Sequence, residues 1–235
     1  MSKQIGMFKP KSEWLPPQEF KDIKDAKRIA IDLETKDPNI TSKGPGWATN
    51  DGNIIGVAVA VDGWEGYYPI RHENSFNFDP IVTLDWLKEM LSTDCDKIAH
   101  NATYDFGWLQ AEGVSWNGRI IDTMIAAPLV DENKYSYSLN ALSKEYLADS
   151  KSEWGLYDAA AQFGVDAKSE MYKMPATFVG EYAEQDAALC LRLWDRLQEE
   201  VTKNDLQTVL DLELDLLPIL IEMRTKGVRV DLEAV

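Results

Sequence analysis

The first third of the chain alternates short apolar runs with polar turns, a pattern typical of strands. One apolar run begins at Ile29 and ends at Thr35, and a second covers residues 54–61. The pair Asp62-Gly63 then predicts a tight turn into a third run over residues 65–70. Three strands in succession predict an antiparallel meander that starts at residue 29.

Beyond the meander, apolar residues recur every three or four positions, which predicts helices between short strands. The helix over 79–92 begins at Asp79-Pro80, an acidic cap followed by a proline that suits the first helical turn. Helices that join successive strands produce parallel crossovers, so we expect a mixed sheet. The other predicted elements of this region are strands at 97–101 and 119–122 and helices at 103–112, 123–130 and 138–147.

The last third of the chain predicts two long helices after an irregular segment. Residues 149–174 have little clean periodicity and are expected to hold one short helix. A helix is predicted to begin at Pro175 and to run toward Val201. A second long helix covers residues 205–226 and ends at Gly227, after which residues 228–231 are predicted to start a strand.

These elements divide the chain into three parts. Residues 1–27 are mixed in composition and contain Pro16-Pro17, so we expect an N-terminal arm there. Residues 28–204 hold the predicted sheet and its flanking helices, which together make an α/β domain. Residues 205–235 form a separate C-terminal helix and following segment.

Composition narrows the class of protein. With 235 residues, 45% of them hydrophobic, the chain can bury a sizeable core, and global disorder is excluded. A net charge of -16 argues against a broad basic surface that binds nucleic acid. Two distant cysteines fit a reducing compartment. Without a long apolar segment or a signal-peptide core, the sequence predicts a cytoplasmic protein with no membrane partner, in the host cytoplasm if the source is viral.

Candidate chemistry begins in the first apolar run, where Asp32 and Glu34 stand one residue apart. Successive side chains of a strand point to opposite faces, so both carboxylates project from one face. Hard divalent cations such as Mg2+ or Mn2+ prefer carboxylate oxygens, which makes the pair half of a metal site. Alternatively, the pair is a chance occurrence in a chain with 40 acidic residues.

Two more segments supply polar groups of the same kind. Asn101 follows a predicted strand and Asp105 lies one helical turn later; as a structural alternative, Asn101 caps the helix and Asp105 is solvated. Tyr182 and Asp186 are four residues apart, so they share one face of a helix. Their structural alternative is a buried tyrosine beside an exposed aspartate.

Together, Asp32, Glu34, Asp105 and Asp186 resemble in order and context the DEDD superfamily of 3'-5' exonucleases. Tyr182 matches the tyrosine subclass of that superfamily, because the histidine subclass would need His at position 181. The resemblance implies a ribonuclease H-like fold, in which a mixed five-stranded sheet, with three antiparallel strands followed by parallel ones, is flanked by helices.

The resemblance extends to the proofreading domain of family A DNA polymerases, the DNA polymerase I type, in a phage-like form. The motifs that carry it are Asp122-Thr-Met124, Ser138-Leu-Asn-Ala-Leu142 and Tyr182-Ala-Glu-Gln-Asp-Ala187. Residues 214–231 resemble the segment that opens the polymerase domain of that family, while the polymerase motifs are absent from the sequence. The resemblance therefore implies a truncated or split polymerase, whose polymerase domain follows in cis or as a separate subunit.

The resemblance also assigns roles. Asp32, Glu34, Asp105 and Asp186 would hold two divalent metal ions, Mg2+ or Mn2+, with Asp32 between them, and Tyr182 would orient the attacking water. The substrate it implies is the 3' end of single-stranded or frayed DNA, from which nucleoside monophosphates are removed. Asn101 would contact the terminal nucleotide, and the backbone near Thr35 would lie beside its 3'-hydroxyl, so both count as substrate-binding.

Several alternatives remain open at this point. Phe106 and Trp108 either stack on bases or belong to the core, and His100 is left out of the catalytic set. The same carboxylates suit a ribonuclease D-like RNA-processing enzyme, against which the polymerase-like tail argues. A catalytically inactive domain that binds a partner is a third possibility, although no carboxylate of the set is missing.

Overall fold

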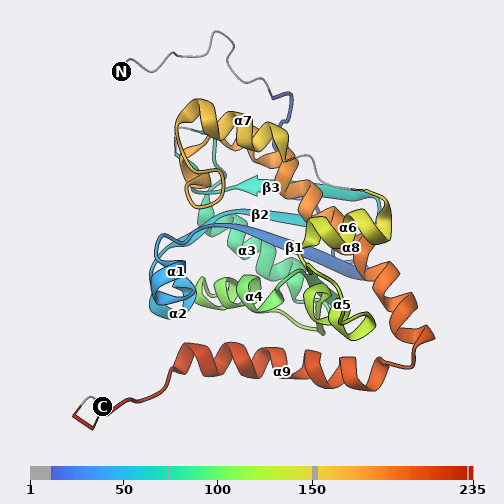
Figure 1. Cartoon of the computed structure of the whole chain (residues 1–235). Coiled ribbons are helices and arrows are strands. Elements are labelled where there is room, and N and C mark those ends of the chain that lie inside the picture. Colours follow the sequence, from blue (N-terminus) through green and yellow to red (C-terminus); the bar gives the residue numbers. More distant parts are fainter. Residues whose placement is uncertain (1–11, 74, 150–152, 232, 235) are drawn as a thin grey trace.

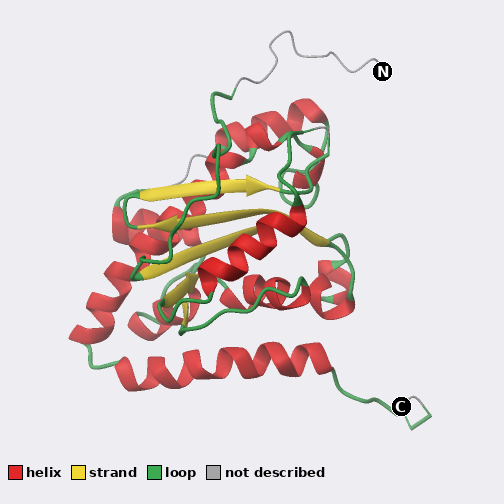
Figure 2. Cartoon of the chain, turned by 180° about the vertical axis from the view of Figure 1, so that it is seen from behind, coloured by secondary structure: helices red, strands yellow, loops and turns green. Residues whose placement is uncertain are grey.

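The structure, a computed structural model, describes residues 12–73, 75–149, 153–231 and 233–234. Its centre is a five-stranded sheet in the order β3-β2-β1-β4-β5, with helices on both faces (Figures 1 and 2). The strands are β1 (Arg28–Lys36), β2 (Asn53–Val61), β3 (Trp64–Pro69), β4 (Asp96–Ala99) and β5 (Ile120–Asp122).

The sheet is mixed, as the sequence predicts. β1 pairs antiparallel with β2, and β2 pairs antiparallel with β3. β4 and β5 are added in parallel, because a helix returns the chain before each of them. β1 pairs with β2 from Ala30 to Lys36 but with β4 only from Arg28 to Ala30. The second half of β1 therefore has a strand neighbour on one side only.

Helices occupy most of the remaining chain. α8 lies across the sheet and contacts β1 to β4, whereas α9 runs along the edge of the molecule below α4 and α5 (Figure 1). The helices are α1 (Ile40–Lys43), α2 (Gly46–Thr49), α3 (Pro80–Leu91), α4 (Ala102–Ala111), α5 (Thr123–Val130), α6 (Leu139–Leu147), α7 (Trp154–Phe163), α8 (Gly180–Lys203) and α9 (Gln207–Lys226), with 3-10 turns η1 (Met171–Lys173) and η2 (Ala176–Phe178).

Sequence patterns that combine a cap with helical spacing predict the helix ends closely. Asp79 caps α3 by accepting hydrogen bonds from the N–H groups of Ile81 and Val82, and Ser138 caps α6 through the N–H of Ala141. Gly227, at φ +68°, ends α9 in the left-handed region that glycine tolerates. The caps explain why these helices begin and end where the sequence predicts.

Two predictions near the C-terminal half are wrong. Pro175 does not begin the long helix, because η2 intervenes and α8 starts at Gly180, where the ring of Trp14 leaves no room for a Cβ atom. The backbone of residues 228–231 forms no strand, since no ladder partner lies beside it in the described chain and Val228 is 88% exposed. The predicted short helix in residues 149–174 is present as α7.

The segment before β1 is an arm that packs along the domain over residues 12–27. Phe20 stacks on Tyr68 of β3 at a centroid distance of 5.2 Å, and Ile23 is buried. Farther back, the indole N–H of Trp14 donates to Glu184 of α8 at 2.8 Å. The arm therefore connects β3 with the helix that carries two of the candidate site residues.

Candidate active site

Asp32 and Glu34 lie in the half of β1 that pairs with β2 alone. They stand opposite Ala58 and Gly56 of β2, and the ladder shifts register immediately after Glu34. Between them, Leu33 has no partner in β4, and its N–H instead donates to Asp105 at 3.0 Å. The Asp105 carboxylate thus occupies the place of a missing strand and joins α4 to the strand that bears the acidic pair.

The N-terminus of α4 is held in place by Asp122 at the end of β5. Its two carboxylate oxygens accept hydrogen bonds from the N–H groups of Asn101 and Ala102 at 3.0 and 2.8 Å, and it also caps α5 through Met124 N–H at 2.8 Å. Burial raises the pKa of Asp122, and the N–H donors oppose that rise. Asp122 therefore fixes the start of the helix on which Asp105 lies.

Tyr182 and Asp186 approach from α8, one helical turn apart, and both are buried. Burial raises the pKa of Tyr182 first, and the negative charges of Glu34, Asp186 and Asp32 raise it further. Its hydroxyl also makes a side-chain hydrogen bond with Asp186 that favours the protonated phenol. Charges carried by β1 and α8 therefore act on one hydroxyl, which keeps its proton.

The carboxylates also act on one another. Burial is the main cause of the raised pKa of Asp105, and the charges of Asp122 and Glu34 add to it. The pKa of buried Tyr67 on β3 is raised by the same burial and by Glu34 and Asp32. Three segments far apart in the sequence thus bring their acidic groups into one electrostatic environment.

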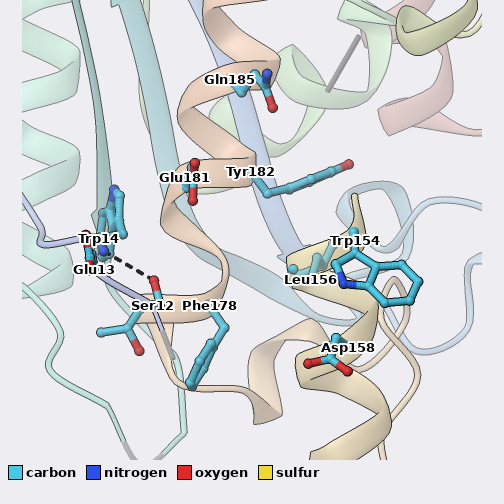
Figure 3. A pocket seen from close by; sticks show the side chains of 12 residues that line it. Ser12, Glu13, Trp14, Trp154, Leu156, Asp158, Phe178, Glu181, Tyr182 and Gln185 are labelled. Carbon is cyan, nitrogen blue, oxygen red and sulfur yellow. Dashed lines mark hydrogen bonds between the residues drawn. The ribbon is translucent and has the colours of Figure 1, made fainter. Parts of the chain in front are cut away.

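A pocket of about 800 Å³ opens beside Tyr182. In Figure 3 the Tyr182 side chain projects from α8 on the side of α7, which contributes Trp154 and Leu156. Trp14 of the arm lies on the other side of α8, and Phe178 of η2 adds a further aromatic wall. The pocket is therefore lined by aromatic side chains, among them Tyr182, and also by the acidic Glu13, Asp158 and Glu181.

Thr35 follows Glu34 in β1, and Asn101 stands at the start of α4. Asn101 is exposed and adopts a left-handed conformation at φ +69° as the N-cap of α4, but its side chain makes no cap hydrogen bond. The alternative in which the Asn101 side chain caps the helix is therefore not what the structure shows. The Thr35 hydroxyl is 2.8 Å from the hydroxyl of Tyr104, which in turn donates to Asp37 at 3.0 Å.

The structure decides two alternatives for aromatic and imidazole side chains. Phe106 and Trp108 are 0% and 3% exposed, so of the two alternatives the core is the one that the structure shows. His100 is 2.9 Å from the hydroxyl of Thr123, which ties it to the start of α5. Sequence reasoning also missed Lys168, whose ammonium donates to the Tyr182 hydroxyl at 2.6 Å, since nothing in its local sequence marks it.

The oxygen atoms that the site offers are of the type that binds a hard divalent cation. Asp32, Glu34, Asp105 and Asp186 offer only carboxylate oxygens, and their mutual repulsion is relieved by positive charge. As the side chains stand, no three His, Cys, Asp or Glu residues of the described chain converge closely enough to hold a metal. The side chains would therefore have to move to bind a cation.

Within the same described ranges, no helix combines the length and apolarity required to cross a membrane.

Comparison with known proteins places this site in a family. A family model described as 3'-5' exonuclease matches residues 15–202. A DNA-directed DNA polymerase of Pseudomonas phage M6 is 37% identical over 227 residues, which are 94% of this chain and 34% of that protein. DNA polymerase I of Borreliella burgdorferi is 24% identical over 213 residues, 90% of this chain and 22% of that protein. The chain thus spans about a third of the length of the phage relative and a smaller share of the bacterial one.

Solved structures share the fold at low sequence identity. Brucella melitensis NrnC with bound Mg2+ has a TM-score of 0.62 at 20% identity, covering 90% of this chain and 92% of that one. The POL domain of Pol1 from M. smegmatis scores 0.61 at 20% identity, with 88% and 30% covered. Escherichia coli RNase D scores 0.57 at 14% identity, with 88% and 47% covered.

The neighbours share the ribonuclease H-like exonuclease fold, and so confirm the predicted fold class. Sequence decides between them, because the polymerase relatives match this chain at up to 37% identity whereas RNase D matches at 14%. The chain therefore belongs to the 3'-5' exonuclease domains of family A DNA polymerases.

Proposed function

We propose that the chain is a metal-dependent 3'-5' exodeoxyribonuclease that removes nucleoside monophosphates from DNA 3' ends and proofreads for a polymerase. The observation that carries this proposal is the approach of carboxylates from β1 and α8 to the Tyr182 hydroxyl, together with Asp105 of α4, which the N–H of Leu33 holds against β1. Nuclease activity follows from the family, and the deoxyribonucleotide substrate is supported by the polymerase relatives.

Asp32, Glu34, Asp105 and Asp186 would hold two divalent cations, Mg2+ or Mn2+. When bound, such ions lower the pKa of water and stabilise the charge that develops on phosphate oxygens. The protein contributes the scaffold. The hydrogen bond from Leu33 fixes Asp105 against β1, while the turn of α8 fixes the separation of Tyr182 and Asp186.

Tyr182 serves as a neutral orienting group. Because burial and three carboxylates raise its pKa, its hydroxyl keeps its proton and can both donate and accept hydrogen bonds. In this state it aligns the attacking water beside Asp186. Thr35 and Asn101 contact the terminal nucleotide, and the exposed Asn101 amide is available for that contact.

The substrate is the 3' end of single-stranded or frayed DNA. A net charge of -16 repels the continuous phosphate backbone of a duplex, so a broad electrostatic grip is absent. The aromatic pocket offers an alternative source of affinity, because stacking on side chains such as Trp154 is worth about 1–3 kcal/mol per base. A short unpaired end fits this combination better than a duplex.

The experiment is the digestion of a single-stranded DNA oligonucleotide labelled at its 5' end. With Mg2+ or Mn2+ we expect a ladder that shortens from the unlabelled 3' end, and we expect EDTA to abolish it. An RNA of the same sequence, assayed in parallel, should be degraded more slowly. Faster digestion of RNA would overturn the substrate assignment, and activity in EDTA would overturn the metal.

The partner is the polymerase portion that the relatives carry beyond the matched third, in cis or as a separate subunit. α9 buries one face, including Leu210, Leu214, Leu217 and Ile221, against the domain, where each side chain contributes about 1.5–3 kcal/mol. Its outer side carries a row of exposed apolar side chains, which are Val209, Leu212, Leu216, Ile219, Leu220 and Met223. An apolar stripe of this kind marks an interaction surface.

This assignment can be tested by sedimentation of the chain with and without the polymerase portion of the phage M6 relative as a separate chain. We expect a complex that is lost when Leu212 and Ile219 are both replaced by Ser. The matched control replaces the exposed Ile81 of α3 by Ser and should leave the complex intact. Self-association of the chain alone, equally abolished by the double change, would instead identify a second copy as the occupant.

A further inference from the structure

Lys168 brings a positive charge to the hydroxyl of Tyr182. Its ammonium nitrogen lies 2.6 Å from the hydroxyl oxygen and 4.3 Å from the centroid of the ring. The same nitrogen is 3.2 Å from a carboxylate oxygen of Glu153, just before α7. The sequence motifs that identify the family do not include this lysine, which lies outside them between α7 and η1.

The turn that carries Lys168 is organised by its own hydrogen bonds. One carboxylate oxygen of Asp166 accepts the N–H groups of Lys168 and Ser169 at 3.0 and 2.8 Å and the Ser169 hydroxyl at 2.8 Å. Glu170 closes the turn by accepting the N–H of Asp166 at 3.0 Å, while Ala167 is buried. These hydrogen bonds fix the backbone of Lys168 independently of the contacts that its side chain makes.

The contact fixes the direction of the phenolic proton. An ammonium group can only donate, so the Tyr182 oxygen must accept from Lys168. The single proton of the hydroxyl is then left for its other neighbour, and the side-chain hydrogen bond with Asp186 supplies that acceptor. Lys168, Tyr182 and Asp186 thus form a chain of donors that ends on a carboxylate of the site.

We propose that Lys168 is a positioning residue of the exonuclease, which holds the Tyr182 hydroxyl in one orientation so that it aligns the attacking water. This inference rests on the proposed function, because the orientation matters only if Tyr182 takes part in hydrolysis. Lys168 acts through Tyr182 and needs no contact with the substrate. Loss of the ammonium should therefore lower kcat and leave KM for single-stranded DNA nearly unchanged.

The deciding experiment is a double-mutant cycle on digestion of single-stranded DNA, using the full 235-residue chain. Lys168→Met should lower kcat about tenfold, the effect of one hydrogen bond to a charged group. In a Tyr182→Phe background the same change should alter kcat by less than about twofold, because the hydroxyl it orients is gone. An undiminished effect in that background would overturn the proposal and point to direct contact with the phosphate.

Lys173→Met provides a matched control. Lys173 also forms an ion pair with a glutamate, Glu170, and lies near a tyrosine ring, that of Tyr172 at 5.6 Å, but it has no contact with Tyr182 among its described interactions. It should digest DNA at the wild-type rate. Equal loss in Lys173→Met and Lys168→Met would mean that the segment, and not the Lys168 contact, controls the rate.

A second readout does not depend on activity. The 13Cζ resonance of Tyr182, assigned by its absence from Tyr182→Phe, should shift in Lys168→Met and stay in place in Lys173→Met. An unmoved resonance in Lys168→Met would overturn the proposal even if the enzyme slowed. If the wild-type chain digests no DNA, the proposed function fails, and the resonance still decides whether Lys168 orients the hydroxyl.

Discussion

The sheet side and the α8 side of the site hold their polar groups by different means. On the sheet side, Asp105 and Asp122 accept hydrogen bonds from backbone N–H groups at the open edge of β1 and the start of α4. On the α8 side, Tyr182 is held by the side chain of Lys168, and Glu184 by the indole of Trp14 and one backbone N–H. The sheet side is thus built by the fold itself, whereas the α8 side depends on segments that pack onto it.

This difference has a consequence for what each side tolerates. The β1–β2 ladder does not involve side chains, so the sheet side can lose Asp32 or Glu34 and keep its geometry, whereas loss of Asp122 would remove the acceptor of the N–H groups at the start of α4. A side-chain donor is removed by a single substitution, so the α8 side can lose its orientation without losing its fold. We therefore expect substitutions of Asp32 or Glu34 on the sheet side to lower activity without lowering stability. On the α8 side we expect substitutions to change the orientation of a side chain without lowering stability.

The largest effect is expected from Asp32→Ala on the sheet side. The substitution deletes a proposed metal ligand from a strand whose ladder to β2 does not involve the side chain. Release of mononucleotides from single-stranded DNA should fall by at least about a thousandfold. The thermal unfolding midpoint should not fall. Full activity in this variant would contradict the site assignment.

Tyr182→Phe on the α8 side should have a smaller effect, about a hundredfold on kcat. The ring and its packing remain, and only the hydroxyl that contacts Lys168 and Asp186 is lost. Steady-state kinetics with Mg2+ in excess measures the change, and Tyr157→Phe on α7, whose half-exposed ring is near Lys168, is the control. A loss as large as that of Asp32→Ala would remove the distinction between ligands and an orienting group.

Most of the sheet side could be predicted from the sequence, because it depends on local patterns. Alternation in the first strand puts Asp32 and Glu34 on one face, and caps such as Asp79 locate the helices. The role of Asp122 in holding α4 was not predicted in detail, since it requires knowing that β5 lies beside β4.

The α8 side was less predictable for a physical reason. A period of four pairs Tyr182 with Asp186, but the approach of Lys168 depends on the tertiary packing of a turn without helical or strand periodicity. Likewise, Gly180 at the start of α8 is packed against the ring of Trp14, a residue 166 positions earlier. The aromatic residues of α4 stayed open between two alternatives, because the sequence alone cannot tell a buried Phe106 from a stacking surface.

Asp105→Asn should raise stability while it lowers activity. Asparagine keeps an oxygen that accepts the Leu33 N–H but removes a buried charge. Burial raises the pKa of Asp105. The stability that the protonated carboxyl gives the wild type is therefore lost as the pH rises through that raised pKa, and the free energy of unfolding falls. In EDTA at pH 8 we therefore expect the variant to unfold at a higher urea concentration than the wild type.

The control for this change is Asp25→Asn, which removes an exposed carboxylate from the arm and should leave stability unaltered. At pH 4 the difference between the Asp105 variant and the wild type should shrink, because the wild-type carboxyl is then protonated. A variant that is less stable than the wild type at both pH values would show that the carboxylate, when charged, strengthens the backbone contact more than burial penalises it.

The smallest effect is expected from Glu184→Gln on the α8 side. Burial raises the pKa of Glu184 to about 7, while hydrogen bonds from Trp14 and the Tyr67 N–H lower it in part. A raised pKa means that stability is fully present below pH 4.5 and is lost as pH rises through 7. Glutamine can still accept from the Trp14 indole, so the variant should lose less stability than the wild type between pH 5 and pH 8. Because the group is partly exposed, solvent screening keeps the difference below about 1 kcal/mol, and the exposed Glu132→Gln should show none. Parallel unfolding curves for wild type and Glu184→Gln across this range would mean that the charge of Glu184 does not hold the arm, and that the packing of Trp14 on Gly180 does. The α8 side would then be attached through the backbone, like the sheet side.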